Sequence, residues 1–155
     1  MRTQDSVVLI SALRSPATYI HTVPKQSRLI AFKNPAFARC AEDAQLVNDN
    51  MYGWSLMQFL RSELGGRGYA IDSSNAPIAE DFGWYLDFAV GEHVGVVVVY
   101  GEDDDPELSV SIEVKTKKKA FFKRSAGDDP EQEGNSLATV IKNALAAHPQ
   151  TTGLR

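Results

Sequence analysis

The sequence predicts a two-layer α+β fold in which an antiparallel sheet of about four strands packs with two main helices. Apolar and polar residues alternate with a period of two over residues 82–90 and 108–115, and an apolar run covers residues 94–100 between them. Apolar residues recur with helical spacing over residues 51–64 and 136–147. Since consecutive strands usually pair with one another, the three strand segments predict a meander.

The first 45 residues show the weakest periodicity. Three prolines interrupt regular structure there: Pro16, Pro24 and Pro35. One apolar stretch, Arg28 to Phe32, is typical of a short strand. We therefore expect residues 1–155 to form a single domain with an irregular N-terminal arm over residues 1–45.

The first main helix is predicted over residues 51–64. Five apolar residues at helical spacing form its buried face: Tyr52, Leu56, Phe59, Leu60 and Leu64. The polar residues 48–50 can cap its start, and Gly65 with Gly66 can end it. A short strand is expected next, over residues 68–72, and the turn-rich residues 73–77 follow.

The meander has the clearest pattern. The large apolar residues of its first strand share one parity: Phe82, Trp84, Leu86, Phe88 and Val90. Gly91-Glu92 fits a two-residue hairpin with glycine in the first position. The 94–100 segment is apolar at both parities, which predicts a central strand covered on both faces. The polar face of the 108–115 strand is expected to meet solvent or a partner.

Residues 116–134 are expected to form a long, mobile connection, because their first half is basic and their second half is acidic and contains glycine. Asn135 or Ser136 can cap the last helix, over residues 136–147. Its apolar face consists of Leu137, Val140, Ile141, Ala144 and Leu145.

Composition excludes several classes of protein. Cys40 is the only cysteine, so neither an internal disulfide nor a zinc site of several thiolates can form. The longest apolar run, Val94 to Tyr100, is far shorter than the roughly 18 residues of a membrane helix, and no signal-peptide pattern is present. A formal net charge of -4 argues against a whole-surface nucleic-acid binder. We expect a cytoplasmic protein without a cofactor or a bound metal.

Residues 80–84 are the most distinctive stretch, because Glu80 and Asp81 precede a strand with a bulky aromatic face. Alternation alone accounts for Trp84 as a core residue with both acids in solvent. In the alternative interpretation the acids border a contact surface. The run from Ala79 to Leu86 resembles that of a set of small uncharacterised bacterial proteins with an E-D-x-G-W signature. The resemblance covers residues 50–148 and implies the fold but no activity.

The triplet Glu113-Val114-Lys115 supports an alternative, enzymatic hypothesis. Residues two apart on a strand project to one face, where a carboxylate can bind Mg²⁺ and a lysine can orient water. The triplet is similar to the E-x-K element of metal-dependent nucleases, and Asp87 or Asp105 would supply another ligand. The competing interpretation is a solvated polar face that continues from Ser109 and Ser111.

A third hypothesis is binding of nucleic acid or another polyanion by a basic run interleaved with Phe121 and Phe122, since lysines can hold phosphates while aromatic rings stack on bases. The run consists of Lys115, Lys117, Lys118, Lys119, Lys123 and Arg124. The competing interpretation is a solvated loop.

We favour a non-enzymatic interaction module, of the class that includes inhibitors and toxin-immunity proteins of bacteria or phages. None of the three histidines stands at a spacing that indicates an activated nucleophile. The charges are segregated into blocks, which favours partner choice by electrostatic complementarity. We expect a protein partner and leave the oligomeric state open. The predicted contact residues are Glu80, Asp81, Trp84, Glu102, Asp103, Asp104 and Asp105.

Overall fold

The structure, a computed structural model, describes residues 8–10, 20–22, 28–71, 76–116 and 129–155. The strands are β1 (Val8–Ile10), β2 (Ile20–Thr22), β3 (Arg28–Lys33), β4 (Met51–Tyr52), β5 (Ile78–Glu80), β6 (Gly83–Val90), β7 (His93–Glu102) and β8 (Asp105–Thr116). The helices are a 3₁₀ helix (Ala41–Gln45), α1 (Trp54–Gly66) and α2 (Pro130–Ala147).

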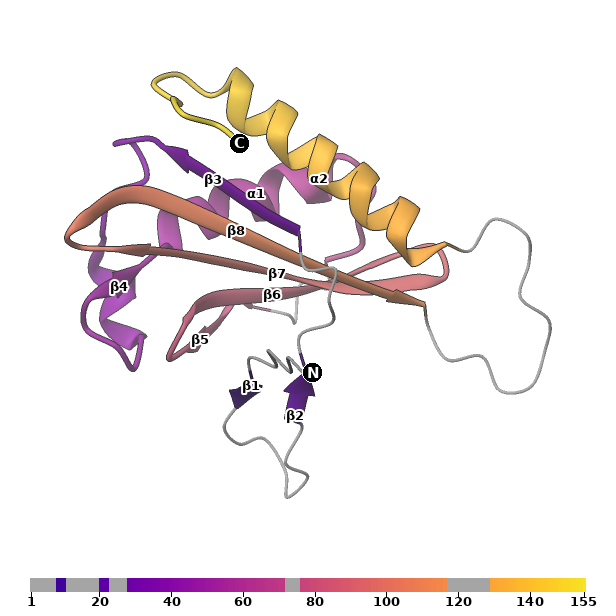
Figure 1. The fold of residues 1–155 in the computed structure, drawn as a ribbon, viewed down its shortest axis with the longest axis horizontal. Coiled ribbons are helices and arrows are strands. Elements are labelled where there is room, and N and C mark those ends of the chain that lie inside the picture. Colours follow the sequence, from indigo (N-terminus) through magenta and orange to yellow (C-terminus); the bar gives the residue numbers. More distant parts are fainter. Residues whose placement is uncertain (1–7, 11–19, 23–27, 72–75, 117–128) are drawn as a thin grey trace, which may run out of the picture.

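Six of these strands form one antiparallel sheet in the order β3-β8-β7-β6-β5, with β4 pairing with the end of β7, while β1 and β2 pair separately. Figure 1 shows α1 and α2 together on one side of the large sheet. The α+β class with an antiparallel sheet and two main helices is therefore confirmed. The predicted number of about four strands is too low, because β4 and β5 span only two and three residues and so show no period.

The core lies between this side of the sheet and the two helices. The largest fully buried side chains come from every layer: Ile30, Phe32, Leu56, Met57, Leu60, Leu64, Trp84, Leu86, Leu108, Ile112, Leu137 and Ile141. Each such side chain contributes roughly 1.5–3 kcal/mol relative to full exposure. The alternation that predicts strands at 82–90 and 108–115 thus arises from burial of one face of β6 and β8.

The hairpin between β6 and β7 has the expected two-residue loop. Val90 pairs with His93, which leaves Gly91 and Glu92 as the turn, and Gly91 has a φ of 53°. Glycine adopts this left-handed conformation without the steric cost that a Cβ imposes. The same hairpin brings β7 back along the full length of β6.

Both main helices begin elsewhere than predicted. Met51 and Tyr52 form β4, because they pair with Glu102 and Gly101 of β7, and α1 starts only at Trp54. The second helix starts at Pro130 instead of residue 136, since the Asp129 side chain accepts a hydrogen bond from the amide of Glu131 and proline suits the first helical position.

One predicted segment contains a strand of the large sheet, and another is shorter than expected. Residues 28–33 pair with β8 at six positions, which agrees with the short strand predicted within the N-terminal arm. Residues 130–134 are helical instead of part of a 116–134 loop, and residues 117–128 lie outside the described residues. The strand predicted over residues 68–72 is reduced to a bridge between Ala70 and Ala89, and residue 72 is likewise not described. No helix in the described ranges is long and apolar enough to cross a membrane.

Candidate binding surface

The side of the sheet opposite the helices carries a row of side chains in direct register across five strands. The row consists of Leu29, Ser111, Val98, Tyr85 and Ile78. Leu29 is 57% exposed and Ile78 is 41% exposed, whereas Val98 and Tyr85 are half-buried. With strands about 4.8 Å apart, the row spans about 19 Å. We call this side of the sheet the open face.

The strand β7 is central, as predicted, but the described part of the chain covers only one of its faces fully. Val97 and Val99 are buried under the helices, whereas Val94 on the open face is 39% exposed. The valines at both parities therefore reflect the preference of β-branched residues for strands as well as burial. The outcome is an apolar strip along the middle of the open face.

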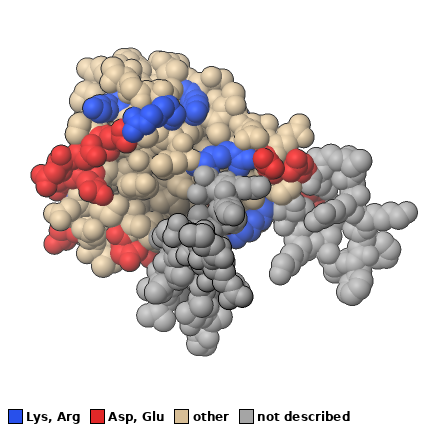
Figure 2. All heavy atoms as spheres, in the orientation of Figure 1, with Lys and Arg blue, Asp and Glu red and all other residues tan. Residues whose placement is uncertain are grey.

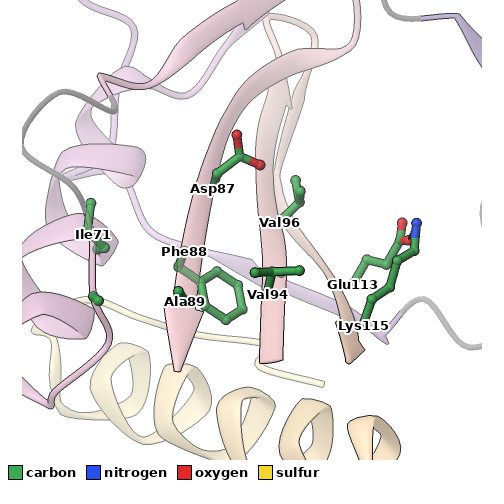
Figure 3. A pocket seen from close by; sticks show the side chains of 10 residues that line it. Ile71, Asp87, Phe88, Ala89, Val94, Val96, Glu113 and Lys115 are labelled. Atoms are coloured by element: carbon green, nitrogen blue, oxygen red, sulfur yellow. Dashed lines mark ion pairs between the residues drawn. The ribbon is translucent and has the colours of Figure 1, made fainter. Parts of the chain in front are cut away.

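A pocket of about 550 Å³ lies at one end of the open face. Its lining comes from β6, β7, β8 and the segment that bridges to β6: Ala70, Ile71, Asp87, Phe88, Ala89, Val94, Gly95, Val96, Glu113 and Lys115. A volume of this size falls in the range of roughly 300–1,000 Å³ that small-molecule sites occupy. Figure 3 shows Val94 and Val96 between Asp87 on one side and the pair Glu113 and Lys115 on the other.

The pocket brings together the three residues of the enzymatic hypothesis. Val96 pairs with Asp87 across β6 and with Glu113 across β8, so the two acids occupy one row on the open face. Lys115 forms an ion pair with Glu113. Asp105, the other candidate ligand, lies at the opposite end of β8, so Asp87 is the acid that the fold places near the triplet. Within the described part of the chain, no three His, Cys, Asp or Glu side chains are grouped as a metal site.

The predicted acidic contact residues gather at the end of the sheet opposite the pocket. Glu80 pairs with Gly83 at the β5–β6 turn, and the adjacent Trp84 pairs with Val99, three residues before the acidic β7–β8 hairpin. Figure 2 shows acidic side chains at this end of the molecule. We call it the acidic end, formed by Glu80, Asp81, Glu102, Asp103, Asp104 and Asp105.

The acidic end is anchored by one arginine. Arg39 donates to both carboxylate oxygens of Asp103, at 2.8 Å and 2.9 Å, and to the carbonyl of Asp49 at 2.7 Å. Glu80 is only 9% exposed, and burial, together with the charge of Asp81, raises its pKa above the usual value. Asp81, Glu102, Asp104 and Asp105 are exposed.

Trp84, which was among the predicted contact residues, is 1% exposed and belongs to the core. Its indole Nε1 donates to the carboxylate of Asp43, which is also 1% exposed and which sequence reasoning missed. Asp43 also accepts hydrogen bonds from the amides of Cys40, Gly53 and Trp54. Burial alone would raise the pKa of Asp43, but these hydrogen bonds outweigh it and hold the pKa below its usual value. This carboxylate therefore has a structural role.

The thiol of Cys40 is not activated as a nucleophile, and most of the predicted basic run lies outside the described residues. Burial first, and then a hydrogen bond to Glu42, raise the pKa of the Cys40 thiol to about 11, so the nucleophilic thiolate is scarce at neutral pH. Lys117, Lys118, Lys119, Lys123 and Arg124 of the predicted basic run lie outside the described residues. Of that run only Lys115 is placed.

Basic and acidic residues are distributed unequally between the described and the remaining residues. Eight of the 16 lysines and arginines lie outside the described ranges: Arg2, Arg14, Lys25, Lys117, Lys118, Lys119, Lys123 and Arg124. Only three of the 20 acidic residues do so: Asp5, Asp72 and Asp128. The sheet and helices are therefore considerably more acidic than the net charge of -4 suggests.

Comparison with known proteins adds no relative whose properties bear on this surface. No protein-family model matches the chain, and neither the curated proteins nor the solved structures contain a significant match.

Proposed function

We propose that this protein is a protein-binding module that uses the open face and the acidic end to bind a partner with apolar and basic side chains. The observation that carries the proposal is the register of Leu29, Val98, Tyr85 and Ile78 across the sheet, with two of the four more than one-third exposed. Antiparallel sheets that face water normally present polar residues there. An exposed row of apolar side chains bordered by polar residues is typical of an interaction surface.

The charge of the rim supports a basic partner. The acidic end borders the open face, and Asp87 and Glu113 lie on the face itself. Arg39 pairs with the carboxylate of Asp103. The other acids of the acidic end outside the β5–β6 pair are exposed to solvent: Asp81, Glu102, Asp104 and Asp105. A partner with a complementary positive surface would associate faster, and the acidic end would repel acidic competitors. An inhibitor or an immunity-type protein, which must bind one partner selectively, fits this arrangement.

The experiment compares two variants with the same added charge on opposite sides of the molecule. Val94→Lys places a lysine on the open face, and Asn143→Lys places one on an exposed position of α2. Tagged wild-type chain and both variants are incubated with nuclease-treated native lysate, and bound proteins are quantified by mass spectrometry. We expect a captured partner with a basic surface. Its capture should fall at least about tenfold with Val94→Lys and should be unchanged with Asn143→Lys.

Retention by Val94→Lys of everything that the wild type captures would contradict the proposal. With the purified partner, the triple change Glu102→Gln, Asp104→Asn and Asp105→Asn is expected to slow association and to reduce its dependence on salt, because these charges lie at the rim. An unchanged association rate would remove the acidic end from the interface.

A second candidate function is Mg²⁺-dependent hydrolysis of phosphodiesters, and one observation favours it. Asp87, Glu113 and Lys115 line the same pocket, although Asp87 is far from the triplet in the sequence. Two carboxylates can bind Mg²⁺, and the Lys115 ammonium can orient water or steady developing charge. Incubation with DNA and RNA, with and without Mg²⁺, is expected to show cleavage that Lys115→Ala abolishes and Lys142→Ala preserves. Absence of cleavage on all substrates would exclude this function.

A further inference from the structure

The outer edge of β3 is paired with the last four residues of the chain, residues 152–155, which we call the tail. Lys33 exchanges two backbone hydrogen bonds with Thr152, at 2.8 Å and 2.9 Å, and Ala31 exchanges two with Arg155, at 3.0 Å and 3.2 Å. Figure 1 shows the C-terminus beside β3. The tail therefore takes the place of a further strand at this edge of the sheet.

The tail is an irregular strand. Its two pairing residues are three positions apart, whereas their partners on β3 are two apart, so the tail contains one extra residue, as a β-bulge does. Gly153 within this stretch has a φ of 64°, and Gln150 just before it has a φ of 70°, which a residue with a Cβ rarely adopts. A regular strand would form the same hydrogen bonds without this distortion.

The edge of β3 continues beyond the tail. Alternate residues of an antiparallel strand direct their backbone groups to the same side, so Leu29 faces outward as Ala31 and Lys33 do. No backbone hydrogen bond reaches this side of Leu29 from the described part of the chain, and its side chain is 57% exposed. Such an edge is a template for another strand. A regular strand would therefore pair with three positions of β3, whereas the tail pairs with two.

The side chains of the tail show which chemistry this edge accepts. Leu154 is half-buried against the core. Nη2 of Arg155 donates to both carboxylate oxygens of Glu107, at 2.7 Å and 2.8 Å. The Arg155 side chain is 67% exposed, and exposed ion pairs contribute little to stability. The edge thus accepts an apolar and a basic side chain, and the ion pair holds the tail only weakly.

We propose that the β3 edge binds an extended peptide segment of a partner protein, which displaces the tail and adds a regular antiparallel strand. The segment carries a basic residue opposite Ala31, within reach of Glu107, and an apolar residue opposite Leu29, where it extends the row on the open face. In binding of this kind, main-chain hydrogen bonds supply affinity and alternate side chains supply specificity. The proposal rests on the function proposed above, since it states how the partner is held.

The probe is a synthetic peptide with blocked ends, Thr-Leu-Arg-Thr-Val-Thr, which copies the tail without its glycine and continues to the position opposite Leu29. It is titrated into the ¹⁵N-labelled full chain up to about 5 mM, with an expected Kd on the order of 0.1–1 mM. Hydrogen exchange should slow at the amide of Leu29, which gains an acceptor. It should become faster at the amides of Thr152 and Arg155, which lose theirs.

Two modified peptides separate strand addition from binding through side chains alone. N-methylation of the arginine and valine nitrogens removes donors that face β3, and binding should weaken at least about tenfold. N-methylation of the leucine and fourth-position threonine nitrogens removes donors that face away, and binding should be unchanged. Equal binding of the two modified peptides would overturn the proposal.

A variant of the protein tests displacement of the tail. Asn34 donates to the Pro149 carbonyl and the Thr151 hydroxyl just before the tail. Asn34→Ala should therefore free the tail more often and tighten peptide binding at least about threefold, whereas Asn48→Ala should leave it unchanged. Wild-type amide shifts in β7 show that the variant is folded. Binding that Asn34→Ala does not tighten, binding without a change at residues 152 and 155, or no response up to about 5 mM would each overturn the proposal.

This test and the test of the open face can fail separately, because Val94 lies on β7, two strands from β3. A partner that is lost with Val94→Lys but is not displaced by excess peptide would uphold the function proposed above and overturn strand addition. A peptide that binds the edge, with a partner that Val94→Lys retains, would uphold the edge site and contradict the open face as the contact surface.

Discussion

The indole Nε1 of Trp84 donates a hydrogen bond of 2.8 Å to Oδ1 of Asp43, which lies 41 positions earlier in the chain. The same oxygen accepts from the amides of Gly53 and Trp54 at the start of α1. One buried carboxylate therefore joins the 3₁₀ helix, the first turn of α1 and the start of β6. It also satisfies helix amides that would otherwise have no partner.

The first prediction concerns the removal of this carboxylate. Asp43→Ala leaves the amides of Gly53 and Trp54 and the Trp84 indole buried without an acceptor, so we expect a loss of about 3–5 kcal/mol of unfolding free energy. The measurement is urea denaturation followed by tryptophan fluorescence. Asp49→Ala, at an exposed position nearby, is the control and should change stability by less than about 0.5 kcal/mol. Similar losses in both variants would contradict the structural role of Asp43.

The second prediction concerns the pH dependence that Asp43 causes. Its folded-state pKa lies below the unfolded-state value of about 3.9, so the unfolded state binds its proton first as pH falls. The contribution of Asp43 to stability is therefore fully present above about pH 4–5 and is lost as pH falls through the lower folded-state value. Unfolding free energy measured between pH 7 and pH 2.5 should decline on the acid side in the wild type, and the decline should be smaller in Asp43→Asn.

For Glu80 the pKa shift, and with it the pH dependence of stability, has the opposite sign to that of Asp43. Burial, with a smaller effect of Asp81, raises its pKa, so at neutral pH the folded state holds a charge that it disfavours. Glu80→Gln is expected to stabilise the protein at pH 7, and this gain should disappear as pH falls below the unfolded-state pKa of about 4.3. The same pH series measures it, with Glu102→Gln, at an exposed position at the end of β7, as the control. A gain that persists at pH 3 would show that the charge of Glu80 is not its cause.

The third prediction concerns Gly134, in the middle of the first half of α2. The Arg28 guanidinium lies where a Cβ at this position would be, and it donates to the Asn135 side chain and the Glu131 carbonyl at 2.6 Å each. Glycine to alanine in a helix normally stabilises by about 1 kcal/mol. We expect Gly134→Ala to stabilise less than this or to destabilise, because Arg28 must move.

A double-mutant cycle tests the cause. In an Arg28→Ala background the obstacle is absent, so Gly134→Ala should recover most of the expected gain in thermal or urea stability. Gly65→Ala in α1, where a Cβ would meet nothing within 4 Å, is the control for helix propensity alone. Equal effects of Gly134→Ala with and without Arg28 would show that the guanidinium does not constrain this position.

The fourth prediction concerns Asn34, which is 3% exposed. Its Nδ2 donates to the Pro149 carbonyl at 3.1 Å and to the Thr151 hydroxyl at 2.9 Å, and it lies 2.9 Å from Nδ1 of His148. The following residues pair with β3, since the amides of Thr152 and Arg155 donate to Lys33 and Ala31. Asn34→Ala should destabilise by about 2–3 kcal/mol and should speed hydrogen exchange at residues 152 and 155 before it affects β7.

The control for this prediction is Asn48→Ala, which removes an exposed side-chain hydrogen bond in the loop before β4. It should leave exchange at residues 152 and 155 unchanged. Uniform acceleration across β7 and the C-terminal residues in Asn34→Ala would instead show that Asn34 affects global stability and does not act as a local tether.

Much of the fold was predictable because its signals are local. Burial of one face of β6 and β8 imposes a period of two, the last helix shows its apolar spacing, and Gly91 supports the tight turn between β6 and β7. The projection of Glu113 and Lys115 to one face also follows from the strand period alone. The short strands β4 and β5 were not predicted, because two or three residues show no period. The pairing partner of β4 is also distant in the sequence.

The sequence by itself determined which residues share a face within each strand or helix, because that depends only on the repeat of the local backbone. The tertiary structure alone decided which faces meet. Asp87 rather than Asp105 joins Glu113 because strand order and register place Val96 between them, and separate segments contain no information on register. The burial of Asp43 beneath Trp84, the open face and the gathering of the acidic end depend in the same way on pairings between distant segments.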